Sequence, residues 1–328
     1  MEPAMTIPQV TKRTNKTKRN AFTLVELMIV IVIIGILVGI SAPFIFAAMR
    51  TAKEFTITNE IVQLDAAIQR FETKHGFFPP AIGEGLEIDP INDPMAATIF
   101  RRYLNRIAPN HAEGTLGSGG GLDIWWAQVG SNLDGESSLV FWLSGLCTSK
   151  QFPLSGSAAI ATSAASGTAT PLAPYNANRI FNDGPIVGLT IDRDVFFDFN
   201  SAQLVTTDAN ATAGVGGIKS YNQPQGKGDS LAYRYRNFKS YRSTNTMVAH
   251  AYHNAVDSNG DPVSFFNPGT FQIICPGMDG QVTGQADPTM VNTNTTTLAA
   301  PMTQADVDPR QDDNITNFAN GRLDTVYE

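Results

Sequence analysis

The N-terminal part of the chain is dominated by an apolar run from Phe22 to Ala48, in which Glu26 is the single charged residue. At about 1.5 Å per residue, a helix of this length spans roughly 40 Å, enough to cross the ~30 Å hydrocarbon core of a bilayer. A secretory signal peptide has a shorter apolar region, of about 7–15 residues. The pattern therefore favours a retained transmembrane helix.

Beyond residue 50 the apolar positions become periodic. They recur at spacings of four, three, four and three, as on one face of an α-helix, at Ile57, Ile61, Leu64, Ile68 and Phe71. Gly76, followed by Pro79 and Pro80, provides a C-terminal stop. The sequence thus predicts one long helix over 22–75, whose outer half packs its apolar stripe on a globular domain.

Three residues inside the apolar run are expected to interrupt this helix. Pro43 removes one backbone hydrogen bond and should kink or locally unwind it. Gly35 and Gly39, four residues apart, would also let a second helix approach closely. The alternative for the two glycines is the general abundance of glycine in membrane helices, and both interpretations stay open.

The remainder, 77–328, is long enough to bury a substantial core. A cap and a proline at Asp93 and Pro94 predict a helix over 94–107, and the nearly all-apolar segment 137–146 is expected to be buried, with helix favoured over strand. Aromatic and β-branched runs predict strands at 194–199, 231–238, 247–255, 262–266 and 270–275.

These elements predict an α+β fold, in which a long N-terminal helix packs on a small antiparallel sheet with extra helices and long loops. The expected parts are a basic leader (1–21), a transmembrane and assembly helix (22–49), its amphipathic continuation (50–76) and a globular head (77–328).

Charge sets the expected orientation. Residues 1–21 contain five basic residues and one acid, and basic flanks of an apolar helix stay on the cytoplasmic side. Removing this leader, of net charge +4, from a chain of net charge −7 leaves −11 on residues 22–328. An acidic exported part argues against nucleic acid as a partner.

The segment from Lys18 to Ile40 resembles the N-terminal cleavage and methylation motif of type IV prepilins and type II secretion pseudopilins: a basic leader, a small residue, then Phe-Thr-Leu-Val-Glu-Leu and an Ile/Val/Gly-rich helix. The resemblance implies cleavage between Ala21 and Phe22 by a prepilin peptidase, followed by N-methylation of Phe22. Ala21 departs from the family, which nearly always has glycine there.

Glu26 gains a role from this resemblance. A carboxylate inside the hydrocarbon core costs on the order of 2.5–3.5 kcal/mol. Cleavage would leave a cationic amine on Phe22, which Glu26 of the same or the next subunit could neutralise. The alternative is that Glu26 reaches the lipid headgroups from one turn inside the membrane.

A second resemblance lies near the C-terminus, where Asn267-Pro268-Gly269, a strand, Gly277-Met278-Asp279-Gly280 and the later Asp312-Asp313 resemble the calcium-loop region of the major pseudopilin. It implies a structural Ca²⁺ held by Asp279 and by Asp312, Asp313 or both. The alternative is that these acids are solvated turn residues.

Little in the chain indicates enzymatic chemistry. It contains four histidines and lacks a nucleophile elbow, a phosphate loop and a paired-cysteine metal motif. Cys147 and Cys275 are the two cysteines; a disulfide and two separate buried thiols are equally consistent with them.

The sequence therefore predicts a non-enzymatic subunit of a type II secretion pseudopilus, anchored in the inner membrane with its head outside the cytoplasm. Implied partners are prepilin peptidase, other copies of the chain, minor pseudopilins and an inner-membrane assembly platform. The alternatives are a type IV or DNA-uptake pilin and a monomeric membrane-anchored binding protein of the cell envelope.

Overall fold

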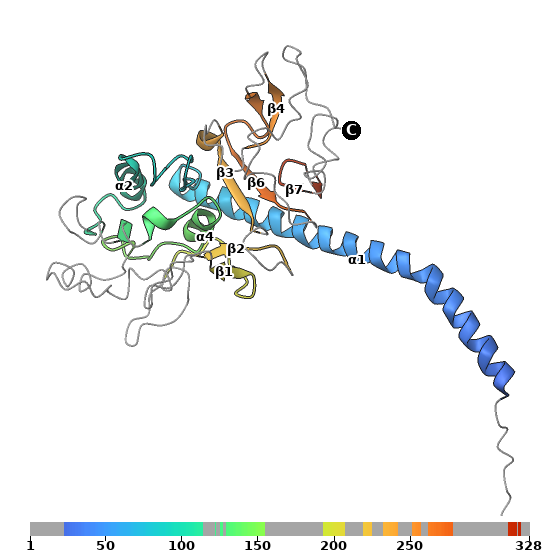
Figure 1. The fold of residues 1–328 in the computed structure, drawn as a ribbon. Helices are drawn as coiled ribbons and strands as arrows, with labels where there is room; N and C mark the ends of the chain where they lie inside the picture. The colour runs from blue at the N-terminus through green and yellow to red at the C-terminus, as the bar shows by residue number, and fades with distance from the viewer. Residues whose placement is uncertain are drawn as a thin grey trace, which may run out of the picture. The chain divides into compact units, whose positions relative to one another are not determined.

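A computed structural model describes residues 23–113, 122, 125–126, 129–154, 193–206, 219–224, 232–241, 251–256, 262–277, 314–319 and 321–322. The chain divides into two compact units, Met1–Arg50 and Thr51–Glu328, which are described separately. The helical elements are α1 (Leu24–His75), α2 (Ala96–Ile107), η1 (Gly130–Asn132), α4 (Ser137–Leu143) and η4 (Phe238–Ser240). The strands are β1 (Leu204–Thr206), β2 (Lys219–Tyr221), β3 (Arg234–Asn237), β4 (His253–Val256), β5 (Pro262–Phe265), β6 (Phe271–Cys275), β7 (Ile315–Thr316) and β8 (Gly321–Arg322) (Figure 1).

Helix α1 ends at His75, where the sequence predicts, and begins at Leu24, two residues after the predicted start. Its last turn closes on Gly76, which has a φ of 75° and donates its amide to the Glu72 carbonyl at 2.7 Å. α1 is one continuous helix with Pro43 inside it, so the helix is not broken at Gly35, Gly39 or Pro43. A kink at Pro43 and a close helix approach at the two glycines stay predictions. A proline removes one donor from the ladder, and the hydrogen bonds on either side are enough to continue the helix.

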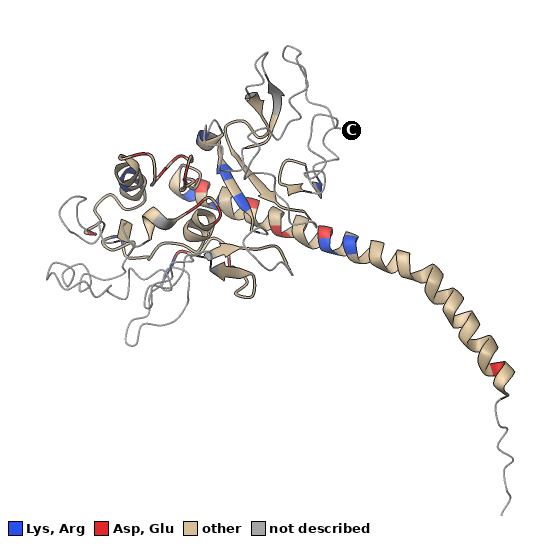
Figure 2. Ribbon diagram, viewed as in Figure 1, with Lys and Arg blue, Asp and Glu red and all other residues tan. Residues whose placement is uncertain are grey.

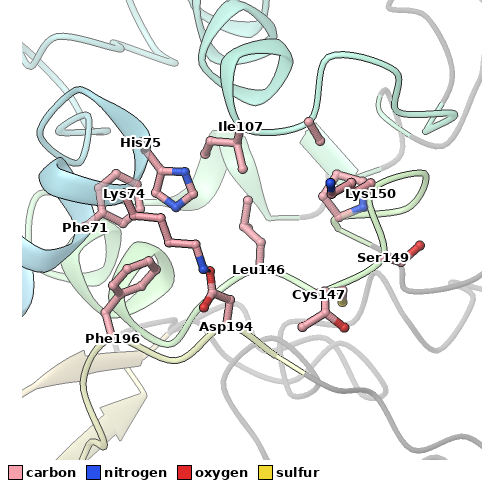
Figure 3. A pocket seen from close by; sticks show the side chains of 13 residues that line it. Phe71, Lys74, His75, Ile107, Leu146, Cys147, Ser149, Lys150, Asp194 and Phe196 are labelled. Carbon is pink, nitrogen blue, oxygen red and sulfur yellow. The ribbon is translucent and has the colours of Figure 1, made fainter.

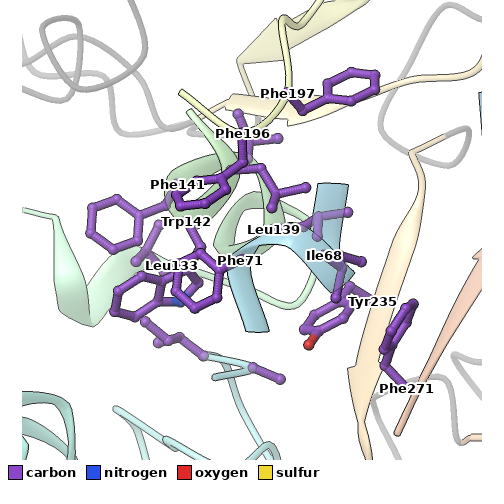
Figure 4. Packing of buried hydrophobic residues seen from close by; sticks show 14 of the residues in the cluster. Ile68, Phe71, Leu133, Leu139, Phe141, Trp142, Phe196, Phe197, Tyr235 and Phe271 are labelled. Atoms are coloured by element: carbon purple, nitrogen blue, oxygen red, sulfur yellow. The ribbon is translucent and has the colours of Figure 1, made fainter. Parts of the chain in front are cut away.

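The second unit builds its core on the outer half of α1. The predicted stripe is buried, together with Ala67, and packs against α4, β3 and β6 (Figure 4). Phe71 lies at the centre, with its ring 5.9 Å from that of Trp142 and 5.1 Å from that of Phe196. Full burial of such side chains contributes about 1.5–3 kcal/mol each, so this packing fixes α1 in the head.

Both predicted helices of the head are confirmed. α2 buries Phe100, Tyr103 and Leu104 on one face, as the spacing of its apolar residues requires. α4 occupies the apolar segment for which helix was favoured, and all seven of its residues are buried. The fold class, α+β with small antiparallel sheets, is confirmed as well.

The largest sheet of the described chain is antiparallel and has the strand order β3-β6-β7-β8. Its central strand β6 is buried at every position, as expected of a strand covered on both faces. Two further antiparallel pairs, β1-β2 and β4-β5, complete the head. Strands predicted around 231–238, 262–266 and 270–275 are present, and β4 covers the end of the predicted 247–255, of which 247–250 lie outside the described residues.

The strand predicted at 194–199 is wrong. The backbone amides of Phe196 and Phe197 donate to the Leu143 carbonyl at 3.0 and 3.1 Å, and the Asp194 amide donates to Leu146 at 3.0 Å. This segment therefore satisfies its donors on the end of α4 instead of on a neighbouring strand. Phe196 packs against Phe71 of α1, and Phe197 packs against Tyr221 of β2, so the aromatic composition of a strand occurs here without strand pairing.

Candidate assembly segment

The described part of the first unit is a bare apolar helix. Between residues 24 and 49 the large apolar side chains are 44–75% exposed. No Lys, Arg or Asp and no second Glu interrupts this surface between Glu26 and Arg50, so α1 is uniformly uncharged over this stretch (Figure 2). An apolar surface of this size requires a cover of lipid or protein.

By length and composition, α1 is the one helix among the described residues that could cross a membrane. Its most apolar window has no residue buried inside the structure, unlike the core helix of a soluble protein. The helix is therefore available to a bilayer or to other helices along its first half.

Glu26 and Thr23 form a reciprocal pair at the start of α1. The Thr23 amide and Oγ1 donate to Glu26 Oε2 at 2.8 and 2.9 Å, and the Glu26 amide donates to Thr23 Oγ1 at 3.2 Å. This is a capping box, in which the N-cap hydroxyl and the acid three residues later satisfy orphan amides of the first turn. The sequence contains its Thr-x-x-Glu signal, which sequence analysis did not use.

The capping box determines where the carboxylate of Glu26 lies. It holds the negative charge at the N-terminus of α1, where the helix dipole favours an anion. The residue before Thr23 would be the first residue of the cleaved chain, so the new N-terminus would lie next to this box in the sequence. The predicted cleavage residues Ala21 and Phe22 lie outside the described residues, so the amine of Phe22 has no position here.

A second acid, Glu60, anchors the head to α1. Its carboxylate accepts hydrogen bonds from Tyr233 Oη at 2.5 Å, Tyr221 Oη at 3.2 Å and Gln203 Nε2 at 2.9 Å. The three donors come from the region of β1, β2 and β3, more than 140 positions along the chain. Burial and the neighbouring negative charge raise the pKa of both tyrosines, so both stay protonated and act as donors.

The C-terminal strands are tied to the same helix. Asn317 Nδ2 donates to Asp65 Oδ2 at 3.0 Å, and Arg322 Nη1 forms an ion pair with Glu54 Oε1 at 3.8 Å. Sequence reasoning missed all of these contacts, because residues so distant along the chain leave no local pattern.

The remaining predicted site residues are not brought together within the described chain. Cys147 Sγ lies 3.9 Å from the Leu154 carbonyl oxygen and Cys275 Sγ lies 3.2 Å from Gln223 Oε1, so the two thiols are not joined to each other. Burial raises the pKa of the Cys147 thiol to about 11.

The three predicted calcium ligands, Asp279, Asp312 and Asp313, lie outside the described residues. The two strand ends that lead to them are in contact, since the Gly277 amide donates to Asn314 Oδ1 at 3.0 Å. Within the part of the chain that the structure describes, no three His, Cys, Asp or Glu side chains are grouped to hold a metal ion.

Comparison with known proteins finds the prokaryotic N-terminal methylation motif at residues 16–42. The chain is similar to two type II secretion system core proteins G. That of Aeromonas hydrophila is 32% identical over 88 residues, and that of Escherichia coli K12 is 31% identical over 94 residues. Each match covers 27% of this chain and spans 60% and 64% of the two relatives, respectively.

No solved structure matches the chain. The methylation motif coincides with the exposed apolar helix and its capping box, and together they indicate a membrane-anchored protein, with α1 as the one candidate spanning helix in the described part of the chain. The motif and the two relatives support a pseudopilin-like family for this chain.

Proposed function

We propose that this chain is a structural subunit of a type II secretion pseudopilus. The observation that carries the proposal is the coincidence of the methylation motif at 16–42 with a helix whose apolar side chains are exposed from Leu24 to Met49. Lipid covers the apolar surface of such a helix before assembly, and other helices cover it afterwards, because packing replaces lipid contacts at little cost in free energy.

Processing follows from the motif. Prepilin peptidase cleaves between Ala21 and Phe22, and Phe22 is then N-methylated. The cationic N-terminus lies one residue before the capping box, so the Glu26 carboxylate is already held at the correct end of α1 to pair with an amine. Pairing with the amine of a neighbouring subunit would fix the axial stagger of the helices.

Orientation and partners complete the proposal. The basic leader keeps the N-terminus cytoplasmic, and the acidic head, built on residues after 50, lies outside the cytoplasm. The chain assembles with copies of itself and minor pseudopilins on an inner-membrane platform. Its role is mechanical, and no catalytic activity is proposed.

Replacing Glu26 tests the assembly role. Glu26→Ala should leave the protein inserted and cleaved but should reduce filament formation at least about tenfold, since a buried charge without its partner costs more than 1.4 kcal/mol. The measurement is cysteine crosslinking between neighbouring copies, with cysteines placed singly over residues 31–40 and both native cysteines replaced.

Glu26→Asp is the matched control, because it keeps the charge and shortens the side chain by one methylene. It should retain more crosslinking than Glu26→Ala does. Crosslinking of Glu26→Ala at the level of the unmodified chain would remove the pairing role from the proposal.

We further propose that Asp279, Asp312 and Asp313 bind a structural Ca²⁺. Support comes from the contact between Gly277, two residues before Asp279, and Asn314, the residue after Asp313. Chelation with EGTA should lower the melting temperature of the unmodified protein, and Asp279→Asn should abolish that difference. A melting temperature that does not respond to EGTA would contradict the site.

A further inference from the structure

A pocket of about 260 Å³ lies in the head at the end of α1, where its last turn meets the loops after α2 and α4 and the segment before β1 (Figure 3). The proposed assembly does not use it, because all of the described residues that line it belong to the second unit. Its depth is apolar and its mouth carries charged side chains.

The interior is built from aromatic and aliphatic groups. The Phe71 ring lies 5.1 Å from that of Phe196 and 4.5 Å from that of His75, and Ile107 and Leu146 face the same space (Figure 3). Aromatic pairs at these separations favour a further ring or branched side chain packed against them.

The mouth is cationic. Lys74 and Lys150 both line it, whereas Asp194 is the one acid among the described lining residues and forms an ion pair with Lys74. Lys74 is held by Asp194, whereas Lys150 is exposed, so the ammonium group of Lys150 is the accessible one. On a chain of net charge −7 this local excess of positive charge selects an acidic partner.

His75 adds a polar group. Burial, and then the charge of Lys74, lower the pKa of its imidazole, so the ring is neutral near pH 7. Among the residues that the structure describes, none hydrogen-bonds to this ring, although Figure 3 shows it facing the pocket. A neutral imidazole can donate to a carboxylate or accept from an amide.

We propose that this pocket binds an acidic segment of a partner protein, which packs one aromatic or branched aliphatic side chain against Phe71, Leu146 and Phe196 and places an adjacent carboxylate at Lys150 and His75. The volume favours a single anchoring side chain, since sites for whole small molecules occupy about 300–1,000 Å³. This inference goes beyond the filament role and does not depend on it.

The test uses the full-length protein in detergent micelles, labelled with ¹⁵N at histidine, so that four imidazoles report. The probe is the peptide acetyl-Phe-Glu-Asp-amide. We expect saturable shifts of the His75 signals and a rise in the His75 pKa on binding, because a carboxylate stabilises the imidazolium. The neutral peptide acetyl-Phe-Gln-Asn-amide should bind at least about fivefold more weakly, as the loss of a roughly 1 kcal/mol charge interaction predicts.

Lys150→Glu reverses one charge at the mouth without changing the core, and it should weaken binding of the acidic peptide about tenfold. Lys53→Glu, on the part of α1 away from the pocket, is the matched control and should change affinity less than twofold. Absence of saturable binding, or equal affinity for the Lys150→Glu and Lys53→Glu proteins, would overturn the proposal.

A third binding measurement distinguishes a protein segment from a free aromatic acid as the ligand of the pocket. Phenylacetate supplies the ring and a carboxylate without a backbone, and we expect it to bind at least about tenfold more weakly than the acidic peptide. Equal or tighter binding of phenylacetate would assign the pocket to a small aromatic acid and overturn the protein partner.

Discussion

At the scale of single residues, two glutamates of α1 illustrate how surroundings decide the role of a side chain. Glu26 is exposed and held by Thr23, so its charge lies at the N-terminal end of α1. Glu60 is enclosed by Tyr221, Tyr233 and Gln203 and serves the fold. One carboxylate remains available to another chain, and the other does not.

The Glu60 cluster makes a prediction about stability. Tyr233→Phe removes a hydrogen bond to a charged acceptor and should lower the free energy of unfolding by about 1.5–3 kcal/mol at neutral pH. Tyr221→Phe is the matched control, since its contact with Glu60 is longer (3.2 Å against 2.5 Å), and should cost less. Urea unfolding of the full-length protein in micelles measures both.

The same variants should alter the pH dependence. The pKa of Tyr233 is raised in the folded state, so its stabilisation is complete below about pH 10 and is lost as the pH rises above that value. Unfolding free energy should then fall by about 1.4 kcal/mol per pH unit for this tyrosine, and Tyr233→Phe should flatten the profile. Identical slopes for the variant and the unmodified chain would contradict the role of Tyr233.

At the scale of elements, the helices and several strands of four or five residues could be predicted, and the strands of two or three residues could not. The spacing from Ile57 to Phe71 identifies the buried face of α1, because helix periodicity is written locally in the sequence. β7 and β8 are two residues each, and they form because β6 and α1 lie beside them. Strands that form by pairing with distant partners carry no recognisable pattern in a sequence of two residues.

The mistaken strand at 194–199 has the same cause. Aromatic enrichment indicates burial, but the choice between a strand and an extended segment depends on which carbonyls receive the amides. Here they are Leu143, the last residue of α4, and Leu146, three residues after it. The close approach of the two segments requires a glycine at position 145.

Gly145 and Gly269 offer a matched test of that approach. Their φ values are 84° and 82°, yet a Cβ on Gly145 would lie 2.2 Å from the Asp194 carbonyl oxygen, whereas one on Gly269 would meet nothing within 4 Å. Gly269→Ala should therefore lower the free energy of unfolding only by the cost of placing a non-glycine residue at positive φ, about 1–2 kcal/mol. Gly145→Ala should lower the free energy of unfolding by about 1–3 kcal/mol more, because its Cβ clashes with the Asp194 carbonyl. Urea unfolding of both variants measures the difference. Equal losses would contradict the packing of 194–197 on α4.

At the scale of the whole molecule, the chain combines an apolar rod without a cover of its own and a head tied to the continuation of the same helix by Glu54, Glu60 and Asp65. In the proposed filament the rod makes the contacts between subunits. The head, through its cationic pocket, is free to bind an acidic partner. Cleavage at Ala21 connects these properties, because it creates the charge that Glu26 is positioned to meet.

The N-terminus of the protein extracted from its native membrane tests this account most directly. Mass spectrometry of the purified protein should find a chain that begins at Phe22, with its mass raised by one methyl group on the α-amine. A mature protein that retains the basic residues of 1–21, or that begins beyond Glu26, would contradict it.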